Sequence, residues 1–155
     1  MKKILLALVS AAFCLGCING GNGSARTIDT PDFSDITGIE WRLISVYVNN
    51  QDIQFNRDAL PEFFKDIYTL NLDGQMLSGT GAPNLYSAPY SISGEGISIM
   101  PMRSTLMASL FEPDVLGEYE FFAFMQGAYE WSLSSKNLEL RSRTDGREIR
   151  LIFGH

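Results

Sequence analysis

Cysteine and histidine are nearly absent from this sequence, and the motifs of common enzymes are missing. The 155 residues include two cysteines, Cys14 and Cys17, and one histidine, His155, at the last position. A Ser-His-Asp triad needs a histidine within the fold, and most zinc sites need several His or Cys ligands. The chain also has no Gly-x-Ser-x-Gly, Gly-x-x-x-x-Gly-Lys or His-Glu-x-x-His pattern. We therefore predict a protein that is not an enzyme, with no catalytic residue, metal site or cofactor.

Clustered positive charge is also scarce. The formal net charge is −6, and phosphate backbones are bound by clustered Lys and Arg, so we expect no nucleic-acid partner. Basic residues gather only in residues 131–155, which hold Arg141, Arg143, Arg147 and Arg150. These arginines are either ordinary solvated strand faces or a patch for an acidic partner or lipid head groups.

No long hydrophobic run is present at the N-terminus. Lys2 and Lys3 precede an apolar stretch over residues 4–16, whereas a spanning helix needs roughly 20 apolar residues. A basic start followed by a short apolar segment is typical of a secretory signal. We predict that residues 1–16 are a signal peptide.

The end of that stretch, Cys14-Leu15-Gly16-Cys17, resembles a bacterial lipobox. In such signals the last cysteine receives a diacylglyceryl group and becomes the first residue after cleavage. The resemblance implies that Cys17 is the lipidation site, with acyl chains such as palmitate, and that membrane lipid is a partner. It implies a lipid-anchored place at a membrane of the bacterial cell envelope, which would be the outer membrane if the cell is Gram-negative. An ordinary secreted protein with a chance Gly-Cys is the alternative.

Residues 17–37 are predicted to be the lipidated cysteine and a flexible tether. They are rich in Gly, Asn, Ser, Thr and Asp, and a random coil of this length reaches roughly 25 Å. With Cys14 removed and Cys17 acylated, the remaining domain has no thiol for a disulfide or a metal.

Residues 38–155 read as one folded domain. Alternating apolar and polar residues predict strands, with Asn49-Asn50, Asp73-Gly74 and Asp145-Gly146 as turns. The predicted strands cover residues 38–48, 67–73, 75–79, 89–93, 97–102, 129–133, 138–142 and 147–153. In the first of them, four residues are expected on one buried face: Ile39, Trp41, Leu43 and Ser45.

Residues 112–126 are the one predicted helix. Pro113 fits its first turn, and an apolar stripe runs along Phe121, Phe124, Met125 and Ala128. The fold class is therefore mainly β with one helix (α+β), an antiparallel meander closing into a small barrel or roll.

The stretch over residues 77–109 carries a family resemblance. Together with Trp41, the matching residues are Ser78, Gly79, Asn84, Tyr86, Ser87, Tyr90, Met102, Ser104, Thr105, Met107 and Ala108. In order and spacing they resemble the META domain, also called HslJ-like, of bacterial envelope proteins. The resemblance implies a small β-rich domain with a helix and with no agreed substrate. It also implies that Pro83 and Ser109, which replace two cysteines common in the family, lie within bridging range of each other.

Asn84, Tyr86 and Tyr90 are the candidate binding residues, because tyrosine offers an apolar body with a polar tip. The other interpretation is that they fix a turn and fill the core of the sheet. The protein or small-ligand partner is not identifiable from the sequence.

The predicted function is that of a non-enzymatic, lipid-anchored envelope protein with a binding or stress-protective role. One alternative is a small barrel that carries an apolar ligand. The other is a carboxylate-dependent hydrolase, for which Asp114, Glu118 and Glu120 are the candidates, the first two on a shared helix face.

Overall fold

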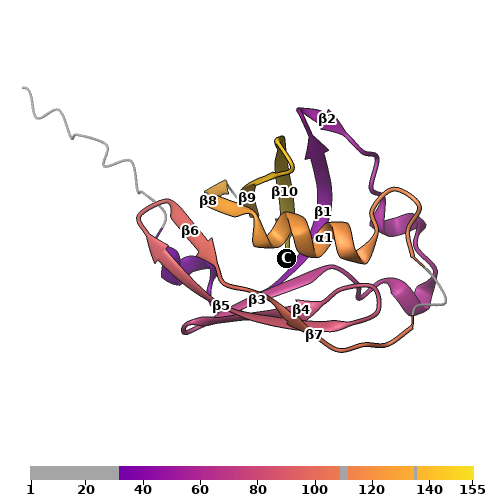
Figure 1. The fold of residues 1–155 in the computed structure, drawn as a ribbon, viewed down its shortest axis with the longest axis horizontal. Helices are drawn as coiled ribbons and strands as arrows, with labels where there is room; N and C mark the ends of the chain where they lie inside the picture. Colours follow the sequence, from indigo (N-terminus) through magenta and orange to yellow (C-terminus); the bar gives the residue numbers. More distant parts are fainter. Residues whose placement is uncertain (1–31, 109–111, 135) are drawn as a thin grey trace, which may run out of the picture.

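The computed structural model describes residues 32–108, 112–134 and 136–155 (Figure 1). The strands are β1 (Glu40–Val48), β2 (Gln51–Asp52), β3 (Thr69–Asp73), β4 (Met76–Thr80), β5 (Leu85–Ser93), β6 (Gly96–Ile99), β7 (Arg103–Ser104), β8 (Ala128–Ser134), β9 (Asn137–Thr144) and β10 (Arg147–Gly154). The helices are α1 (Glu118–Gln126) and the 3₁₀ turns η1 (Phe33–Ile36), η2 (Arg57–Ala59) and η3 (Glu62–Phe64).

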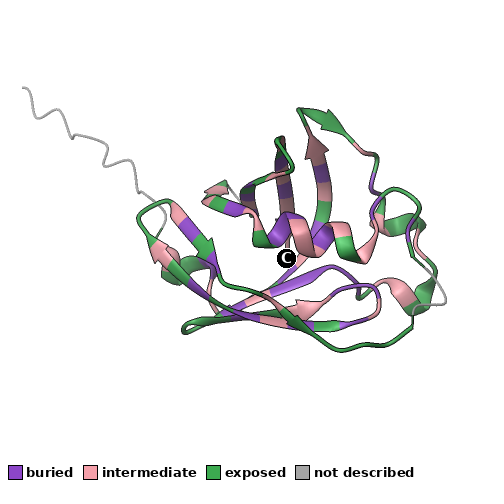
Figure 2. Ribbon diagram, viewed as in Figure 1, coloured by how far each residue is buried: buried purple, intermediate pink, exposed green. Residues whose placement is uncertain are grey.

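Eight of the strands form a closed antiparallel barrel in the order β1-β3-β4-β5-β6-β8-β9-β10, because β10 pairs back onto β1. The short strands β2 and β7 pair only at its margin, with β1 and β5. Closure gives β1 and β10 a partner on the side where an open meander would leave its first and last strands exposed. The predicted α+β class and the predicted barrel are confirmed. Along the strands, buried residues alternate with exposed ones (Figure 2).

The first strand changes its buried face halfway along its length. Trp41 and Leu43 face the core as predicted, but the pairing with β10 shifts between Leu43 and Ser45. This irregularity inserts one residue, so Val46 is fully buried while Ser45 is not. The expectation for Ser45 is wrong because a bulge reverses the two-residue alternation.

The hairpin turns follow the sequence with one shift. Asn49 and Asn50 have φ of 50° and 64°, and Asp145 also has a positive φ, as two-residue hairpin turns require. The β3–β4 turn comes one residue later than predicted: Asp73 pairs with Met76, which leaves residues 74–75 as the loop.

The helix begins later than the sequence pattern indicates. Pro113 belongs to a preceding turn, which is closed by a hydrogen bond from the Leu116 amide to the Pro113 carbonyl (3.2 Å). The Glu112 carboxylate accepts a hydrogen bond from the backbone amide of Glu118, the first residue of α1. Asp114 therefore lies outside the helix and shares no helix face with Glu118, which corrects both expectations.

Helix α1 packs against the interior of the barrel. Figure 1 shows it lying between β8–β10 on one side and β3–β5 on the other. Phe121, Phe124 and Met125 have no solvent exposure, and the Phe121 ring lies 4.7 Å from that of Tyr68 and 5.9 Å from that of Tyr86. The predicted apolar stripe is thus core packing, continued by buried Ala128 at the start of β8.

The 3₁₀ turn η1, which lies within the predicted tether, also packs against the core. Asp32 caps this turn through the Ser34 amide, and Ile36 is fully buried. The Trp41 indole N–H donates to the Ile36 carbonyl at 2.9 Å. Packed structure therefore begins before residue 38, because apolar side chains at 33 and 36 complete the core.

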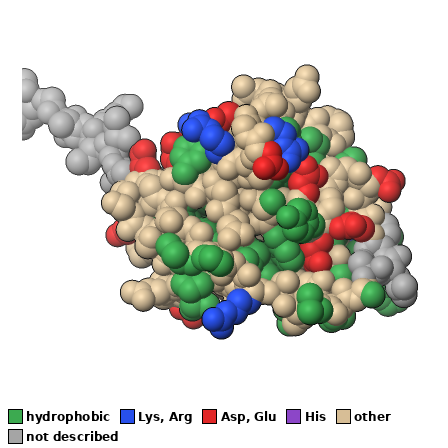
Figure 3. Space-filling model, viewed as in Figure 1, with side chains coloured by type: hydrophobic (Ala, Val, Ile, Leu, Met, Phe, Trp, Pro, Cys, Tyr) green, Lys and Arg blue, Asp and Glu red, His purple; other side chains and the backbone are tan. Residues whose placement is uncertain are grey.

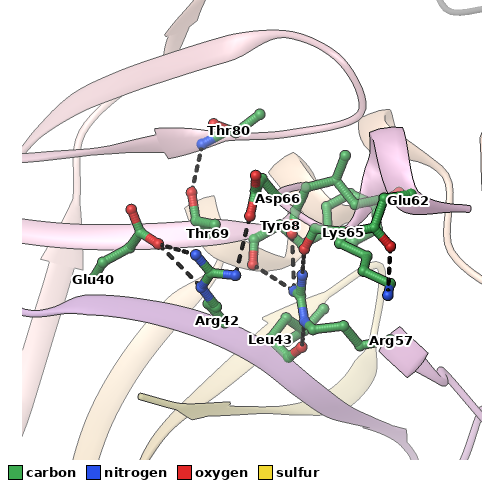
Figure 4. Close-up of polar contacts among 11 residues, drawn as sticks. Glu40, Arg42, Leu43, Arg57, Glu62, Lys65, Asp66, Tyr68, Thr69 and Thr80 are labelled. Carbon is green, nitrogen blue, oxygen red and sulfur yellow. Dashed lines mark hydrogen bonds and ion pairs between the residues drawn. The ribbon is translucent and has the colours of Figure 1, made fainter. Parts of the chain in front are cut away.

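Arg57 connects β1 to the segment that leads into β3 (Figure 4). Its guanidinium donates to the carbonyls of Leu43 (2.9 Å), Ile67 (2.8 Å) and Tyr68 (3.3 Å), and also to that of Lys65. Burial lowers its pKa, although a guanidinium remains charged in proteins. Where backbone pairing is interrupted, one side chain therefore satisfies four carbonyls.

Candidate functional site

Asn84 lies directly before β5 and is 6% exposed. Its amide oxygen accepts hydrogen bonds from the Thr105 hydroxyl (2.8 Å) and the Met107 amide (2.7 Å). Its nitrogen donates to the Met107 carbonyl (3.2 Å) and to a carboxylate oxygen of Glu118 (2.6 Å). All four hydrogen-bonding positions of the side-chain amide are therefore used.

Glu118 completes this arrangement from the first turn of α1. Its other carboxylate oxygen accepts hydrogen bonds from the backbone amides of Ala82 (2.5 Å) and Asn84 (2.6 Å). A carboxylate at a helix N-terminus is also favoured by the helix dipole. We call Asn84, Thr105, Met107 and Glu118 the Asn84 network; it joins the β4–β5 loop, the segment after β7 and the helix.

Both candidate tyrosines are buried and bonded to backbone carbonyls. The Tyr86 hydroxyl donates to the Thr69 carbonyl at 2.6 Å, and burial raises the pKa of Tyr86 far above its usual range. The Tyr90 hydroxyl donates to the Gly74 carbonyl at 2.9 Å. The observed contacts of Asn84, Tyr86 and Tyr90 thus fix turns and fill the core, and none of the three lines the four surface pockets described. Their role in binding stays a prediction.

The three carboxylates considered for hydrolysis serve separate purposes. Glu118 belongs to the Asn84 network, whereas Glu120 forms an ion pair with Arg147 at 3.0 Å. Asp114 is exposed in the turn before the helix. Across the described ranges, no group of three His, Cys, Asp or Glu side chains is placed to hold a metal ion.

A groove that the sequence does not reveal lies beside η1 and has a volume of about 520 Å³. We call it the η1 groove; its lining consists of Asp32, Phe33, Ile92, Gly94, Glu95, Trp131, Ser132 and Leu133. The Phe33 ring lies 5.4 Å from that of Trp131, edge to face, and 5.7 Å from that of Tyr90. The Trp131 indole donates to the Gly94 carbonyl at 2.9 Å, which fixes the groove floor against the β5–β6 hairpin.

The η1 groove is lined by apolar side chains and by two acidic ones. Phe33, Ile92, Trp131 and Leu133 supply the apolar surface, Asp32 and Glu95 supply carboxylates, and no basic residue is among the lining. Figure 3 shows acidic side chains beside the place where the described chain begins. The volume of the η1 groove lies within the range of roughly 300–1,000 Å³ that is typical of ligand pockets.

The arginines of the C-terminal strands are paired with carboxylates. Arg150 and Arg141 contact Glu139 at 2.8 and 3.1 Å, Arg143 pairs with Glu148, and Arg147 pairs with Glu120. Hydrogen bonds from Arg150, and then Arg141, lower the pKa of Glu139. This network of ion pairs agrees with one of the two interpretations of the arginines in residues 131–155, namely that they lie on an ordinary solvated face of the sheet.

Several predictions fall on residues beyond the described ranges. Cys17 and the signal peptide are among these, and so is Ser109. The expected proximity of Pro83 and Ser109 therefore stays a prediction. Within the described ranges, no helix has both the length and the apolar character needed to cross a bilayer.

These features define a class: a closed eight-stranded antiparallel barrel whose interior is packed by one helix and whose groove lies at the surface. The sequence profile of the META domain matches residues 34–152. The chain belongs to the META domain family, as the motif over residues 77–109 predicts.

Two solved structures share the fold at low sequence identity. A DUF4847 family protein from Bacteroides vulgatus has a TM-score of 0.57 and 12% identity, and the match covers 79% of this chain and 95% of that one. A protein from Burkholderia xenovorans has a TM-score of 0.56 and 16% identity, covering 78% and 83%. At such identities the likeness shows the barrel fold alone. Comparison with curated proteins gives no match.

Proposed function

We propose that this protein is a non-enzymatic binding domain of the bacterial cell envelope, held at a membrane by acylated Cys17. The lipobox-like Cys14-Leu15-Gly16-Cys17 and the META family match support this proposal. Asp32, the first described residue, lines the η1 groove, so an anchor at Cys17 would join the chain 15 positions before this groove residue.

The observation that carries the binding role is the contrast between the packed interior and the open groove. Leu43, Leu70, Leu72, Phe121 and Phe124 all face the interior with no exposure, so a ligand would have to displace them. Eight-stranded barrels are just wide enough to be filled by their own side chains or to hold one small ligand. This barrel is of the filled kind, which favours recognition at its surface over transport of an apolar ligand inside.

Catalysis by carboxylates is the weaker candidate. A glycosidase-type mechanism needs two carboxyl groups that face one substrate about 5–10 Å apart. The Glu118 carboxylate accepts three hydrogen bonds from the protein itself, and Glu120 is paired with Arg147. Neither group faces the η1 groove, whose own carboxylates are Asp32 and Glu95.

The anchor is tested by the Cys17→Ser variant in cells that process lipoproteins. Each buried acyl CH₂ contributes about 0.8 kcal/mol, so several chains hold the domain at the membrane. We expect the unchanged chain to partition into detergent and Cys17→Ser to appear in the soluble fraction. Cys14→Leu is the matched control, because it changes the other thiol and keeps the acceptor. Equal detergent partitioning of Cys17→Ser and the unchanged chain would refute the anchor.

A further inference from the structure

Strand β8 extends beyond the hairpin with which it pairs. Its register with β6 consists of Gly96 opposite Glu130, followed by a hydrogen bond from the Trp131 amide to the Glu95 carbonyl at 2.8 Å. There the β5–β6 hairpin turns, while β8 continues to Ser134. Residues 132–134 keep their pairing with β9 on the other side.

The backbone groups of Leu133 point toward the η1 groove. In an antiparallel strand, successive residues direct their N–H and C=O groups to opposite neighbours. Because the Trp131 amide points to the β6 side, the N–H and C=O of Leu133 point to that side too, past the end of the hairpin. The groove lies along this edge, since both Ser132 and Leu133 line it.

The groove supplies what an added strand needs. A strand edge offers main-chain hydrogen bonds, and pockets beside it select alternate side chains of an extended peptide. Phe33, Ile92 and Leu133 form an apolar surface for such side chains. Asp32 and Glu95 supply negative charge with no basic lining residue to offset it, so the complementary side chains are Lys and Arg.

We propose that the η1 groove binds an extended peptide segment with alternating apolar and basic residues, which pairs with residues 132–134 of β8 as an additional strand. This rests on the binding role proposed above and deepens it by naming the occupant of the groove, but it does not depend on acylation of Cys17, so the peptide test and the anchor test can fail separately. The occupant is a segment of another protein. The chain's own residues 18–31, which precede Asp32 in the sequence, are the competing occupant that the experiment separates.

The test uses a chain of residues 17–155 with Cys17→Ser, which contains every described residue. The probe is a fluorescent acetyl-Lys-Val-Lys-Val-Lys-Val-amide, and binding is measured by fluorescence anisotropy. A Glu-Val peptide of the same length tests charge. A Lys-Val peptide with N-methyl groups on alternate backbone nitrogens tests strand pairing. It keeps the side chains but loses the N–H donors along the edge of the peptide that would pair with β8.

Two charge reversals test the position of the site. Glu95→Lys reverses a carboxylate in the hairpin loop of the groove, and Asp114→Lys is the matched control in the exposed turn before α1. Neither side chain is buried, so both variants are expected to fold, as checked by circular dichroism. Deleting residues 18–31 tests the chain's own segment as occupant.

We expect saturable binding of the Lys-Val peptide, weakened about tenfold or more by Glu95→Lys, by the Glu-Val replacement and by N-methylation. Asp114→Lys should leave the affinity within about twofold, because it lies outside the groove. The absence of binding, equal affinity for both charges, or equal effects of the two reversals each overturn the proposal. An affinity that rises about tenfold on deletion of residues 18–31 also overturns it, since the chain's own segment then fills the groove.

Discussion

The Asn84 network makes a quantitative prediction about stability. Replacing Asn84 by Asp keeps the shape of the side chain and turns its donor nitrogen into an oxygen. That oxygen would then face the Glu118 carboxylate oxygen that now lies 2.6 Å from the amide nitrogen. The bond to the Met107 carbonyl would be lost as well, while the two bonds accepted by the other oxygen would remain.

The magnitude follows from the bonds removed. A hydrogen bond to a charged group contributes about 1.5–3 kcal/mol and a neutral one about 1 kcal/mol. Repulsion between two adjacent carboxylates adds to this loss until one of them takes up a proton. We expect Asn84→Asp to lower the free energy of unfolding by about 3–5 kcal/mol near pH 7, a large part of the total for a small domain.

The companion variant is Glu118→Gln, whose amide nitrogen must face other donors in either orientation: the side-chain nitrogen of Asn84, or the backbone amides of Ala82 and Asn84. In the double variant Asn84→Asp with Glu118→Gln, the amide and the carboxylate exchange places, so the bond between them is restored in the reverse direction. The remaining glutamine oxygen can still accept from the amides of Ala82 and residue 84. We therefore expect the double variant to recover about 2 kcal/mol or more relative to the sum of the single changes.

The assay is urea unfolding of the chain of residues 17–155 with Cys17→Ser, followed by circular dichroism. Extrapolation to water gives the free energy of unfolding for each of the four proteins in the cycle. Two results would refute this reasoning: single variants within about 1 kcal/mol of the parent, or a double variant whose loss equals the sum of the single losses.

Three further predictions concern stability. Gly79→Ala should lower it by about 1–3 kcal/mol, because an added Cβ would lie 2.1 Å from a backbone oxygen of β3, whereas Gly154→Ala, with its nearest neighbour at 3.5 Å, should be tolerated; thermal unfolding compares the two. The lowered pKa of Glu139 gives a stabilisation that is present above its ordinary value of 4.5 and is lost as pH falls through the folded-state pKa. Glu139→Gln should therefore lower the melting temperature at neutral pH and flatten its acid dependence, and an unchanged profile would contradict the pairing with two arginines. Replacing Pro83 and Ser109 by Cys should raise the melting temperature under oxidising conditions and not under reducing ones, which checks their predicted proximity.

The barrel could be predicted because its signals are local. Alternation in residues 67–73, 138–142 and 147–153 gives half-buried strands, and residues with positive φ mark the hairpins between them. If each strand pairs with the next strand in the sequence, the one choice left is whether the sheet closes into a barrel. Closure is favoured because it pairs the free edges of the first and last strands.

Other features depend on contacts that no local pattern encodes. The bulge at Ile44 lies in the pairing of β1 with β10, whose register shifts between Leu43 and Ser45, and no pattern within residues 38–48 marks it. Helix α1 starts late because a turn precedes it, closed by the hydrogen bond from the Leu116 amide to the Pro113 carbonyl. This turn places the Leu116 side chain in the core. Arg57 reads as an ordinary surface arginine until the carbonyls around it are known.

The candidate site shows the same limit. Asn84 and Glu118 are 34 positions apart, and their bond depends on the helix entering the barrel. The η1 groove combines residues 32–33, 92–95 and 131–133, three short segments that carry no shared motif. Composition predicts a tether for residues 32–33, because Ser, Thr and Asp outnumber the apolar residues around them, and only the structure shows that Phe33 and Ile36 pack against the core.

The pairing of β10 with β1 has a consequence for how the chain reaches this structure. Leu43 lies opposite Phe153, so the contact that closes the ring joins the two ends of the domain. A chain that emerges from its N-terminus onward can form each hairpin in turn, yet β1 has no permanent neighbour on that side until the last strand appears. Contacts between residues so far apart in the sequence form late, and they slow the folding of the domain. Until then the sheet stays open on that side of β1, and the eight residues of β10 decide when it closes into a barrel.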